Sequence, residues 1–305
     1  MPLHPEIARV LGAIPERPEG VLDPESMRAL EEADAPPVAA RVPVYGIDDA
    51  VVPSESGGIP VRIYTPARAG SFGIIVYFHG GAFFLGSLET HDHVARLLAS
   101  ETGCKVVSVG YRLAPEHPFP AGLDDCLTTV RWVAGGGDSL GWDRRTLAVA
   151  GDSSGGNFAA AVAALAHDDG LEAITHQILY YPSLDLDFEL ERYASLRENA
   201  VGYGLETAGL RPFNAFYLNS GADPSDPRVS PIKRRDLTGL PAALILTGEF
   251  DPLRDEAELY GQRLRQSGVR TMVSRYAGAG HGFVQHFSWL PEYRRAFTET
   301  REFLR

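Results

Sequence analysis

The stretch Leu147-Ala-Val-Ala-Gly-Asp-Ser-Ser-Gly-Gly156 decides the fold, because it is typical of a buried strand that turns sharply into a helix. In such a Gly-x-Ser-x-Gly turn the serine lies in a strained backbone conformation at the carboxyl end of the strand, and its neighbours must be small. Gly151, Gly155 and Gly156 meet that requirement. The stretch therefore nominates Ser153 as a nucleophile.

A second glycine-rich turn lies upstream, where the apolar stretch 73–78 leads into His79-Gly-Gly-Ala-Phe-Phe-Leu-Gly-Ser87. A tetrahedral intermediate carries its charge on one oxygen, which backbone N–H groups of such a loop stabilise together with the N–H that follows the nucleophile. The sequence does not distinguish which two loop amides point into the site. The candidate oxyanion donors are the backbone amides of Gly80, Gly81, Ala82 and Ser154.

A serine hydroxyl becomes a nucleophile only when a base removes its proton and a carboxylate orients that base. When the serine lies on a strand-to-helix turn of this kind, the acid and then the base follow it in the chain, on loops after late strands. Two loops qualify, Gly248-Glu-Phe-Asp-Pro-Leu-Arg-Asp255 and Ala277-Gly-Ala-Gly-His-Gly-Phe283. We therefore predict Asp251 as the acid and His281 as the base.

Each of these two assignments has alternatives. Glu249 and Asp255 share the acid loop, although Asp255 would also favour the following helix by lying in its first turn. His286 is the nearest substitute for the base. Other histidines are interpreted as surface or packing residues: His4, His91, His93, His167 and His176.

Short apolar strands alternate with amphipathic helices, which predicts an α/β fold with a mostly parallel central sheet and helices on both faces. The chain of 305 residues is expected to form one domain over residues 1–305. The predicted strands are 61–66, 73–78, 104–111, 146–151, 176–181, 242–247 and 271–276. The predicted helices are 91–100 with Thr90 as its N-cap, 121–133, and 158–167 as the continuation of the helix after the serine turn.

Two segments interrupt this alternation, residues 1 to about 45 and about 183 to 215. Both mix charged and apolar residues at helical spacing, and we predict that they form a helical cap. Aromatic residues of the second segment are candidates for a substrate pocket, with packing of the cap onto the body as the alternative. These aromatic residues are Phe188, Tyr193, Tyr203, Phe213, Phe216 and Tyr217. The substrate-pocket residues we select are Phe83, Phe84, Asp152, Phe213 and Tyr217.

The charge and composition exclude several classes of partner. The formal net charge of −12, from 28 basic and 40 acidic residues, argues against a nucleic acid or an anionic membrane surface. No apolar run approaches the roughly 18 residues needed to span a bilayer, and the N-terminus lacks the pattern of a secretory signal. The sequence thus predicts a cytoplasmic protein that acts on small molecules, without stable membrane insertion.

Neither the cysteines nor the histidines suggest a metal or a cofactor. Cys104 and Cys126 show no Cys-x-x-Cys spacing and are expected to be buried thiols. The His, Cys, Asp and Glu residues form no cluster with metal-ligand spacing. We therefore expect no metal ion and no cofactor.

Taken together, the motifs resemble those of the hormone-sensitive-lipase-like bacterial esterases, a branch of the α/β-hydrolase superfamily. The resemblance spans most of the chain and implies a cap over an eight-stranded-type sheet, hydrolysis of short- to medium-chain carboxylic esters, no cofactor, and a homodimer paired through a sheet edge. It also implies the roles already assigned to Ser153, Asp251 and His281. It is carried by His79-Gly-Gly81, Tyr111-Arg-Leu-Ala-Pro-Glu-His-Pro-Phe-Pro-Ala121, Gly151-Asp-Ser-Ser-Gly-Gly156, Asp251-Pro-Leu-Arg-Asp255 and His281-Gly-Phe283.

The departures from the family pattern are small. Ala82 stands where many members carry a further glycine, and Ser154 stands where alanine is common, but both residues keep the backbone amide. The segment 111–121 is interpreted as structural, so Glu116 and His117 receive no catalytic role.

The predicted function is that of a serine carboxylesterase that works through an acyl-enzyme. The same triad would also serve an amidase, a lactonase or an acyltransferase, and a non-catalytic ligand receptor on the same fold is a further alternative.

Overall fold

The computed structural model describes residues 2–13, 23–55, 57–136 and 139–305. Within these residues the centre is an eight-stranded sheet in the order β1-β2-β4-β3-β5-β6-β7-β8. β2 runs antiparallel to its neighbours β1 and β4, and the other adjacent pairs are parallel, which confirms the mostly parallel sheet. The strands are β1 (Gly46–Val52), β2 (Ile59–Thr65), β3 (Phe72–Phe78), β4 (Lys105–Val109), β5 (Trp142–Asp152), β6 (His176–Tyr180), β7 (Ala242–Phe250) and β8 (Thr271–Gly280).

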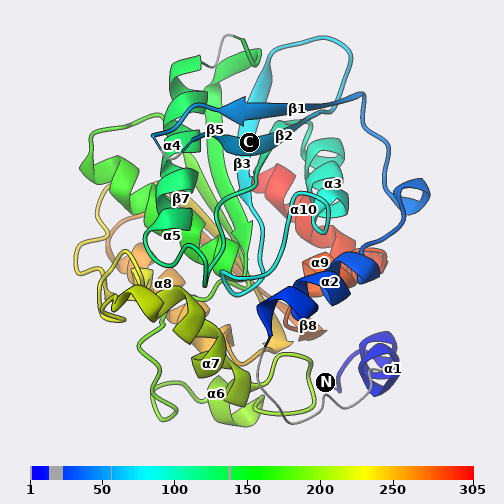
Figure 1. The fold of residues 1–305 in the computed structure, drawn as a ribbon, viewed down its shortest axis with the longest axis vertical. Coiled ribbons are helices and arrows are strands. Elements are labelled where there is room, and N and C mark those ends of the chain that lie inside the picture. The colour runs from blue at the N-terminus through cyan, green and yellow to red at the C-terminus, as the bar shows by residue number, and fades with distance from the viewer. Residues whose placement is uncertain (1, 14–22, 56, 137–138) are drawn as a thin grey trace.

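Helices cover both faces of the sheet (Figure 1). On one face lie α3 (Asp92–Thr102) and α10 (Pro291–Phe303), and on the other lie α4 (Ala121–Gly136), α5 (Ser154–Asp168) and α8 (Arg254–Gln266). None of the described helices is long and apolar enough to cross a membrane. The remaining helices are α1 (Pro5–Ala13), α2 (Pro24–Asp34), α6 (Ser195–Glu198), α7 (Thr207–Tyr217), α9 (Phe283–His286) and the 3-10 turns η1 (Val38–Ala40), η2 (Leu218–Ser220) and η3 (Pro231–Lys233).

Strand β3 shows why the sequence requires two helical layers. Its side chains alternate between the faces, so that Ile74 and Val76 join the core under α4, α5 and α8, whereas Ile75 and Tyr77 join the core under α3 and α10. All four side chains are fully buried. Burying one such aliphatic side chain contributes about 1.5–3 kcal/mol, so a strand that is apolar on both sides is stable only when both faces are covered.

The predicted strands and helices are all present, with boundaries that shift by a few residues. The helix after the serine turn starts at once, because α5 begins at Ser154. Thr90 is not the N-cap of α3: its hydroxyl accepts the N–H of Ser87, and His91 occupies the capping position. Cys104 and Cys126 are buried free thiols, as predicted.

Sequence analysis missed β1 and α10, and it anticipated α8 only through its first turn at Asp255. β1 is an edge strand that pairs with β2 and carries Asp48 and Asp49 exposed at its centre, so it lacks the apolar signal of the inner strands. α8 and α10 are rich in charged residues and bury only a narrow apolar face. These three elements complete the sheet and its two layers.

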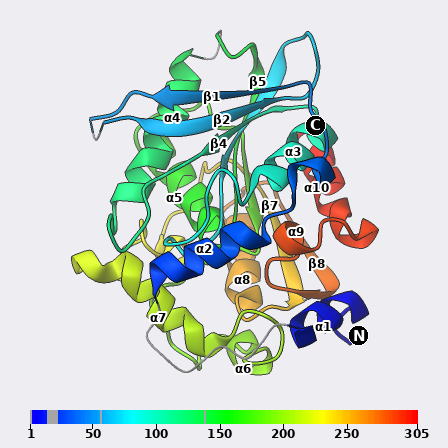
Figure 2. The same ribbon diagram turned by 45° about the vertical axis from the view of Figure 1, so that its right-hand side comes forward.

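The segments predicted as a cap contribute α1, α2, α6 and α7. Figures 1 and 2 show these helices at the end of the sheet toward which β8 points, which is the end where the nucleophile turn follows β5. Residues 1 and 14–22 of the predicted cap lie outside the described residues. The division into a body and a cap therefore stays a prediction.

Candidate active site

Ser153 lies in the turn between β5 and α5 with φ 54° and ψ −118°. A non-glycine residue in such a conformation costs on the order of 1–3 kcal/mol and persists only where its surroundings hold it. The N–H of Ser153 donates to the carbonyl of Tyr180 at 2.9 Å, and the N–H of Ser183 donates to the carbonyl of Ser153 at 3.1 Å. The end of β6 and the residues after it thus hold both sides of the strained residue.

The glycines of this turn allow two backbone segments to approach closely. A Cβ atom on Gly151 would lie 2.2 Å from the carbonyl oxygen of Gly155, and one on Gly155 would lie 2.0 Å from that of Phe78. Both contacts are far below van der Waals distance and involve backbone atoms that have no freedom to move aside. The small residues around Ser153 are therefore required by packing as well as by the turn itself.

His281 lies between Ser153 and Asp251. Its Nε2 is 2.9 Å from the Ser153 hydroxyl oxygen, and its Nδ1 is 2.8 Å from Oδ2 of Asp251. Asp251 follows β7 and His281 follows β8, whose carboxyl ends meet at the same edge of the sheet as that of β5. The other carboxylate oxygen of Asp251 accepts the N–H of Leu253 at 2.8 Å. The structure thus brings together the three residues that we selected from the sequence.

The alternatives for the acid and the base are engaged elsewhere. Glu249 accepts the N–H of Gly278, near the end of β8, at 2.8 Å. Asp255 accepts the N–H of Ser195 at 2.8 Å and pairs with a neighbouring arginine. His286 lies on α9, with its ring against Phe287. These contacts favour the row of Ser153, His281 and Asp251.

The loop that follows β3 carries the candidate oxyanion donors, and one of their amides already has a partner. The N–H of Gly80 donates to Oδ1 of Asp152 at 2.9 Å and so does not point to an oxyanion in this structure. Among the described residues, neither the amide of Gly81 nor that of Ala82 donates to a protein acceptor. The candidate oxyanion donors from this loop are therefore the backbone N–H groups of Gly81 and Ala82. The N–H of Ser154, the residue after the nucleophile, is the third candidate.

Asp152, which we also selected for the pocket, is only 1% exposed, and its carboxylate bonds to groups in the interior behind this loop. Besides Gly80, it accepts the hydroxyl of Tyr77 at 2.5 Å and lies 3.6 Å from Nε2 of His91. Burial by itself raises the pKa of the Asp152 carboxyl, but His91 and Tyr77 outweigh this and hold that pKa below its ordinary value. Sequence reasoning missed this network, since it assigned His91 only to packing.

The neutral side chain of His79 fills the space beneath the same loop. Burial, reinforced by nearby His91, lowers the pKa of His79 from 6.5 to about 3. Its ring stacks on that of Tyr111 with the centroids 4.2 Å apart, and the Tyr111 hydroxyl donates to the carbonyl of His79 at 2.8 Å. The segment that begins at Tyr111 thus supports the oxyanion loop from below.

Helix α2 holds the far end of the oxyanion loop, a role that sequence reasoning did not identify. Arg28 donates to the carbonyl of Phe84 and to that of Ala114, both at 2.7 Å, and pairs with Glu116. One turn further along, Glu31 accepts the N–H of Gly86 at 2.7 Å. The sequence feature that could have indicated this role is the i, i+3 spacing of Arg28 and Glu31, which places both side chains on one face of the helix.

Comparison with known proteins identifies the family of this chain. A family described as having the alpha/beta hydrolase fold matches residues 75–285, a range that includes the oxyanion loop and all three residues of the row. The chain belongs to this α/β-hydrolase family. The resemblance to hormone-sensitive-lipase-like esterases and the predicted fold class are thereby confirmed.

Several relatives of this hydrolase are named as esterases. It is 43% identical to a carboxylesterase of Mycobacterium tuberculosis over 74% of the chain and 71% of the relative. It is 36% identical to an ethyl acetate hydrolase of Pseudomonas putida over 88% and 85% of the two chains. A hyperthermophilic esterase structure from Pyrobaculum calidifontis superposes with a TM-score of 0.88 at 39% identity, covering 99% and 97% of the chains. These names confirm the predicted class, a carboxylic ester hydrolase.

Most of the predicted pocket residues of the hydrolase pack against one another. Phe83 stacks on Tyr217 with ring centroids 4.1 Å apart, and both side chains are buried. Phe84 is buried against Phe213, at 5.6 Å, and against Phe216. These contacts favour the alternative for Phe83 and Tyr217, in which the two aromatic rings pack α7 onto the body of the protein.

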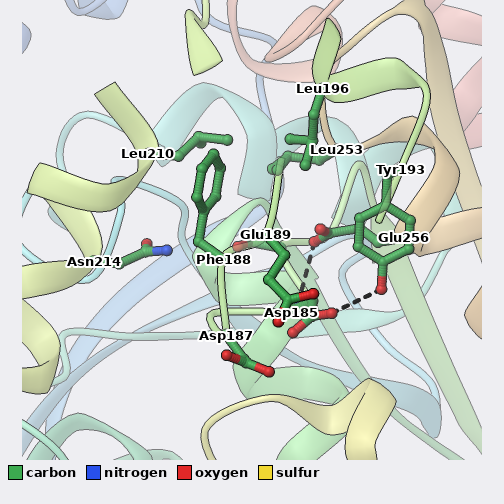
Figure 3. Close-up of a pocket in the computed structure, with 11 residues that line it drawn as sticks. Asp185, Asp187, Phe188, Glu189, Tyr193, Leu196, Leu210, Asn214, Leu253 and Glu256 are labelled. Carbon is green, nitrogen blue, oxygen red and sulfur yellow. Dashed lines mark hydrogen bonds between the residues drawn. The ribbon is translucent and has the colours of Figure 1, made fainter. Parts of the chain in front are cut away.

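A small pocket of the hydrolase is lined by residues of α6 and α7 and of the segments that follow β6 and β7 (Figure 3). Two of its lining residues are bonded to the proposed catalytic residues: the N–H of Ser183 donates to the carbonyl of Ser153, and the N–H of Leu253 donates to the carboxylate of Asp251. None of the five predicted pocket residues lines it. The lining residues are Ser183, Asp185, Asp187, Phe188, Glu189, Tyr193, Leu196, Leu210, Asn214, Leu253 and Glu256.

The pocket is apolar on one side and acidic on the other. Figure 3 shows Phe188 pointing toward Leu210, while the Tyr193 hydroxyl donates to Asp185 at 2.7 Å on the opposite side. Burial raises the pKa of Glu256 well above its ordinary value, and its carboxyl accepts the N–H of Leu184 at 2.6 Å. Among the described residues, no group of three or more His, Cys, Asp or Glu side chains could hold a metal ion.

Proposed function

We propose that this hydrolase is a serine carboxylesterase that cleaves short- to medium-chain carboxylic esters through an acyl-enzyme on Ser153. The observation that carries the proposal is the position of His281, 2.9 Å from the Ser153 hydroxyl and 2.8 Å from the Asp251 carboxylate. A serine, a histidine and a buried carboxylate in this order are the parts that nucleophilic acyl transfer requires.

In the acylation step, Ser153 attacks the carbonyl carbon of the ester while Nε2 of His281 takes the hydroxyl proton. The negative charge that develops on the carbonyl oxygen is stabilised by the N–H groups of Gly81, Ala82 and Ser154. His281 then gives its proton to the leaving alcohol as the carbon–oxygen ester bond breaks. The acyl group remains bound to Ser153.

In the deacylation step, His281 takes a proton from water, and the resulting hydroxide attacks the acyl-enzyme. Collapse of the second tetrahedral intermediate releases the carboxylic acid and returns the proton to Ser153. Asp251 holds Nδ1 of His281 in the protonated tautomer, which leaves Nε2 free to accept.

The pocket next to Ser183 does not hold the acyl group, because its volume of about 10 Å³ has room for about one water molecule. Phe213 and Phe84 remain candidates for the wall on the side of the oxyanion loop. A relative named as an ethyl acetate hydrolase is consistent with small substrates.

The cap and the homodimer remain part of the proposal. Helices α1, α2, α6 and α7 would form the cap, since they lie at the end of the sheet that carries Ser153 (Figure 2). A second copy would pair along β8, the edge strand that leaves Met272 exposed. The cytoplasmic location stays a prediction from the sequence.

The experiment that tests the function compares wild type with Ser153→Ala on p-nitrophenyl esters from acetate to palmitate. We expect Ser153-dependent turnover with the highest kcat/KM on short chains. Full activity of Ser153→Ala would overturn the triad, and no turnover by folded wild type would overturn ester hydrolysis. Matched amides, lactones and alcohol acceptors measured in parallel identify the amidase, lactonase and acyltransferase alternatives.

A further inference from the structure

The short helix α6 lies directly on the loop that carries Asp251. The sheet does not extend to this residue, because the last pair between β7 and β8 joins Phe250 to Gly280. The backbone of the acid loop therefore needs other partners for its carbonyl groups. Those partners come from α6 and the residue after it, about 50 positions earlier in the chain.

Asn199, at the end of α6, provides the most direct contact. Its side-chain amide donates to the carbonyl of Asp251 at 3.0 Å and to that of Glu249 at 3.3 Å. The side chain of Asn199 is buried, with 3% of the residue exposed. One amide group thus holds both the carbonyl of Glu249, two residues before the acid, and the carbonyl of the acid itself.

Ser195, at the start of α6, holds the next part of the same loop. Its hydroxyl donates to the carbonyl of Pro252 at 2.7 Å and accepts the N–H of Asp255 at 3.2 Å. In return, the N–H of Ser195 donates to the carboxylate of Asp255 at 2.8 Å. Ser195 is fully buried. Asp255, considered first as an alternative acid, therefore anchors α6 to the acid loop.

The same turn also reaches the pocket and α7. Leu196 of α6 lines the pocket, and its carbonyl accepts the hydroxyl of Thr207 at 2.7 Å at the start of α7. The position of the acid loop is thus joined through α6 to the wall of the pocket. A displacement of α6 would move the carbonyl of Asp251 and, with it, the carboxylate that faces His281.

We propose that Asn199 and Ser195 are positioning residues that hold Asp251 in line with His281, so that the triad is complete only when α6 is seated on the acid loop. This inference rests on the proposed function, because it assigns a role to residues that act through Asp251. A displacement of a catalytic group by about 1 Å costs on the order of 10²-fold in rate. Loss of one holding contact should therefore lower kcat and leave KM nearly unchanged.

The test measures kcat and KM on p-nitrophenyl butyrate for Asn199→Ala and for the isosteric Asn199→Asp, which keeps the shape but lacks the amide donor. We expect both variants to lose about 10- to 100-fold in kcat with KM within about twofold of wild type. Wild-type kcat in both variants, or a loss that appears only in KM, would overturn the proposal. A loss in Asn199→Ala alone would also overturn it, because it would reflect a cavity.

Two comparisons separate positioning from general destabilisation. Thr300→Val removes a buried hydroxyl that bonds to Tyr180 on the far face of the sheet, and it should lower the Tm without lowering kcat. In an Asp251→Ala background, Asn199→Ala should add almost no further loss, since it acts through the missing carboxylate. Additive losses, or an equal loss of kcat in Thr300→Val, would contradict the inference.

Ser195→Ala provides a second route to the answer if the Asn199 variants do not fold. It removes the bond to the carbonyl of Pro252, and we expect a loss of kcat of about 10-fold that is likewise absent in the Asp251→Ala background. Unchanged kcat in Ser195→Ala would contradict the proposal that α6 positions Asp251. Ser153→Ala, assayed beside these variants, reports on the proposed function alone: if it is active, the triad fails independently of α6.

Discussion

The carboxylate of Asp152 accepts the backbone N–H of Gly80 at 2.9 Å, which joins the residue before the nucleophile to the first glycine of the oxyanion loop. The two halves of the proposed site, the attacking oxygen and the donors that stabilise the intermediate, are thus held together by one buried charge. A Cβ atom on Gly80 would lie 2.4 Å from that carboxylate, so the loop approaches it as closely as glycine allows.

Asp152→Asn should lower kcat/KM by about 10- to 100-fold, because the loop amides would lose their alignment with the developing oxyanion. The substitution keeps the shape but removes the charge that Tyr77, Gly80 and His91 face. Steady-state kinetics on a short p-nitrophenyl ester measure the effect. Asp48→Asn, an exposed change on β1, is the matched control, and equal activity of the two variants would refute the role of Asp152.

Substitutions in the row of Ser153, His281 and Asp251 should differ in severity. Ser153→Ala and His281→Ala should each lower kcat by up to about 10⁶-fold, since each removes a group that bonds to the reacting atoms. Asp251→Asn should cost on the order of 10⁴-fold, because it leaves His281 in the wrong tautomer. Single-turnover rates check these values, and circular dichroism verifies folding. A mild effect at His281 would exclude it as the base.

Arg28→Ala should release the far end of the oxyanion loop. The guanidinium bonds to the carbonyls of Phe84 and Ala114, and each hydrogen bond to a charged group contributes about 1.5–3 kcal/mol. We expect a lower Tm and a loss of roughly 10-fold in kcat/KM. Arg9→Ala removes an arginine of comparable size from an exposed pair on α1 and should change neither quantity. Indistinguishable variants would show that α2 does not support the loop.

Gly155→Ala should prevent stable folding, because the added Cβ atom would lie 2.0 Å from the carbonyl oxygen of Phe78. An overlap of this size between backbone segments belongs to the mechanisms that cost more than about 4 kcal/mol. Gly135→Ala in α4 is the control, since a Cβ there meets nothing within 4 Å and helix propensity favours alanine by about 1 kcal/mol. Urea unfolding of the soluble fractions distinguishes the two, and a stable Gly155→Ala variant would contradict the packing.

The buried histidine beneath the loop predicts a loss of stability in acid. The pKa of His79 is about 3 in the folded protein and 6.5 ordinarily. Between these values the imidazole is protonated in the unfolded state and neutral in the folded state. The free energy of unfolding should therefore fall as the pH drops from about 6.5 toward 3. Near pH 5, His79→Gln should reduce this slope by up to about 1.4 kcal/mol per pH unit. The pKa of His91 is raised, so this residue opposes the loss of stability in acid. Wild type and His79→Gln must therefore be compared under identical conditions.

An unchanged slope of the unfolding free energy in His79→Gln would show that His79 is not the residue responsible. Denaturant unfolding at pH 4.5, 5.5 and 6.5 gives the three points that are needed. The comparison relies on the difference between the variants, since other carboxylates and histidines contribute equally to both.

Features that depend on residues close together in the chain could be predicted from the sequence. The serine turn, the order of the acid and the base, and the alternation of strands and helices each depend on residues close together in the chain. Ser153, Asp251 and His281 could be selected because each follows an apolar strand, and parallel strands bring their carboxyl ends to one edge. β1 was missed because its two central aspartates interrupt the apolar pattern expected of a strand. Its pairing with β2 is a tertiary contact that the local sequence does not show.

Contacts between distant segments were decided only by the tertiary structure. No local pattern shows that Asp152 takes up the amide of Gly80, or that Asn199 holds the carbonyl of Asp251, 52 positions away. The pocket likewise gathers residues from the segment after β6, from α6 and α7 and from the start of α8. The sequence by itself thus determined which groups could react, because their types and local turns are encoded nearby. The tertiary structure decided which groups support them, because a buried polar atom bonds to whatever the packed chain brings within reach.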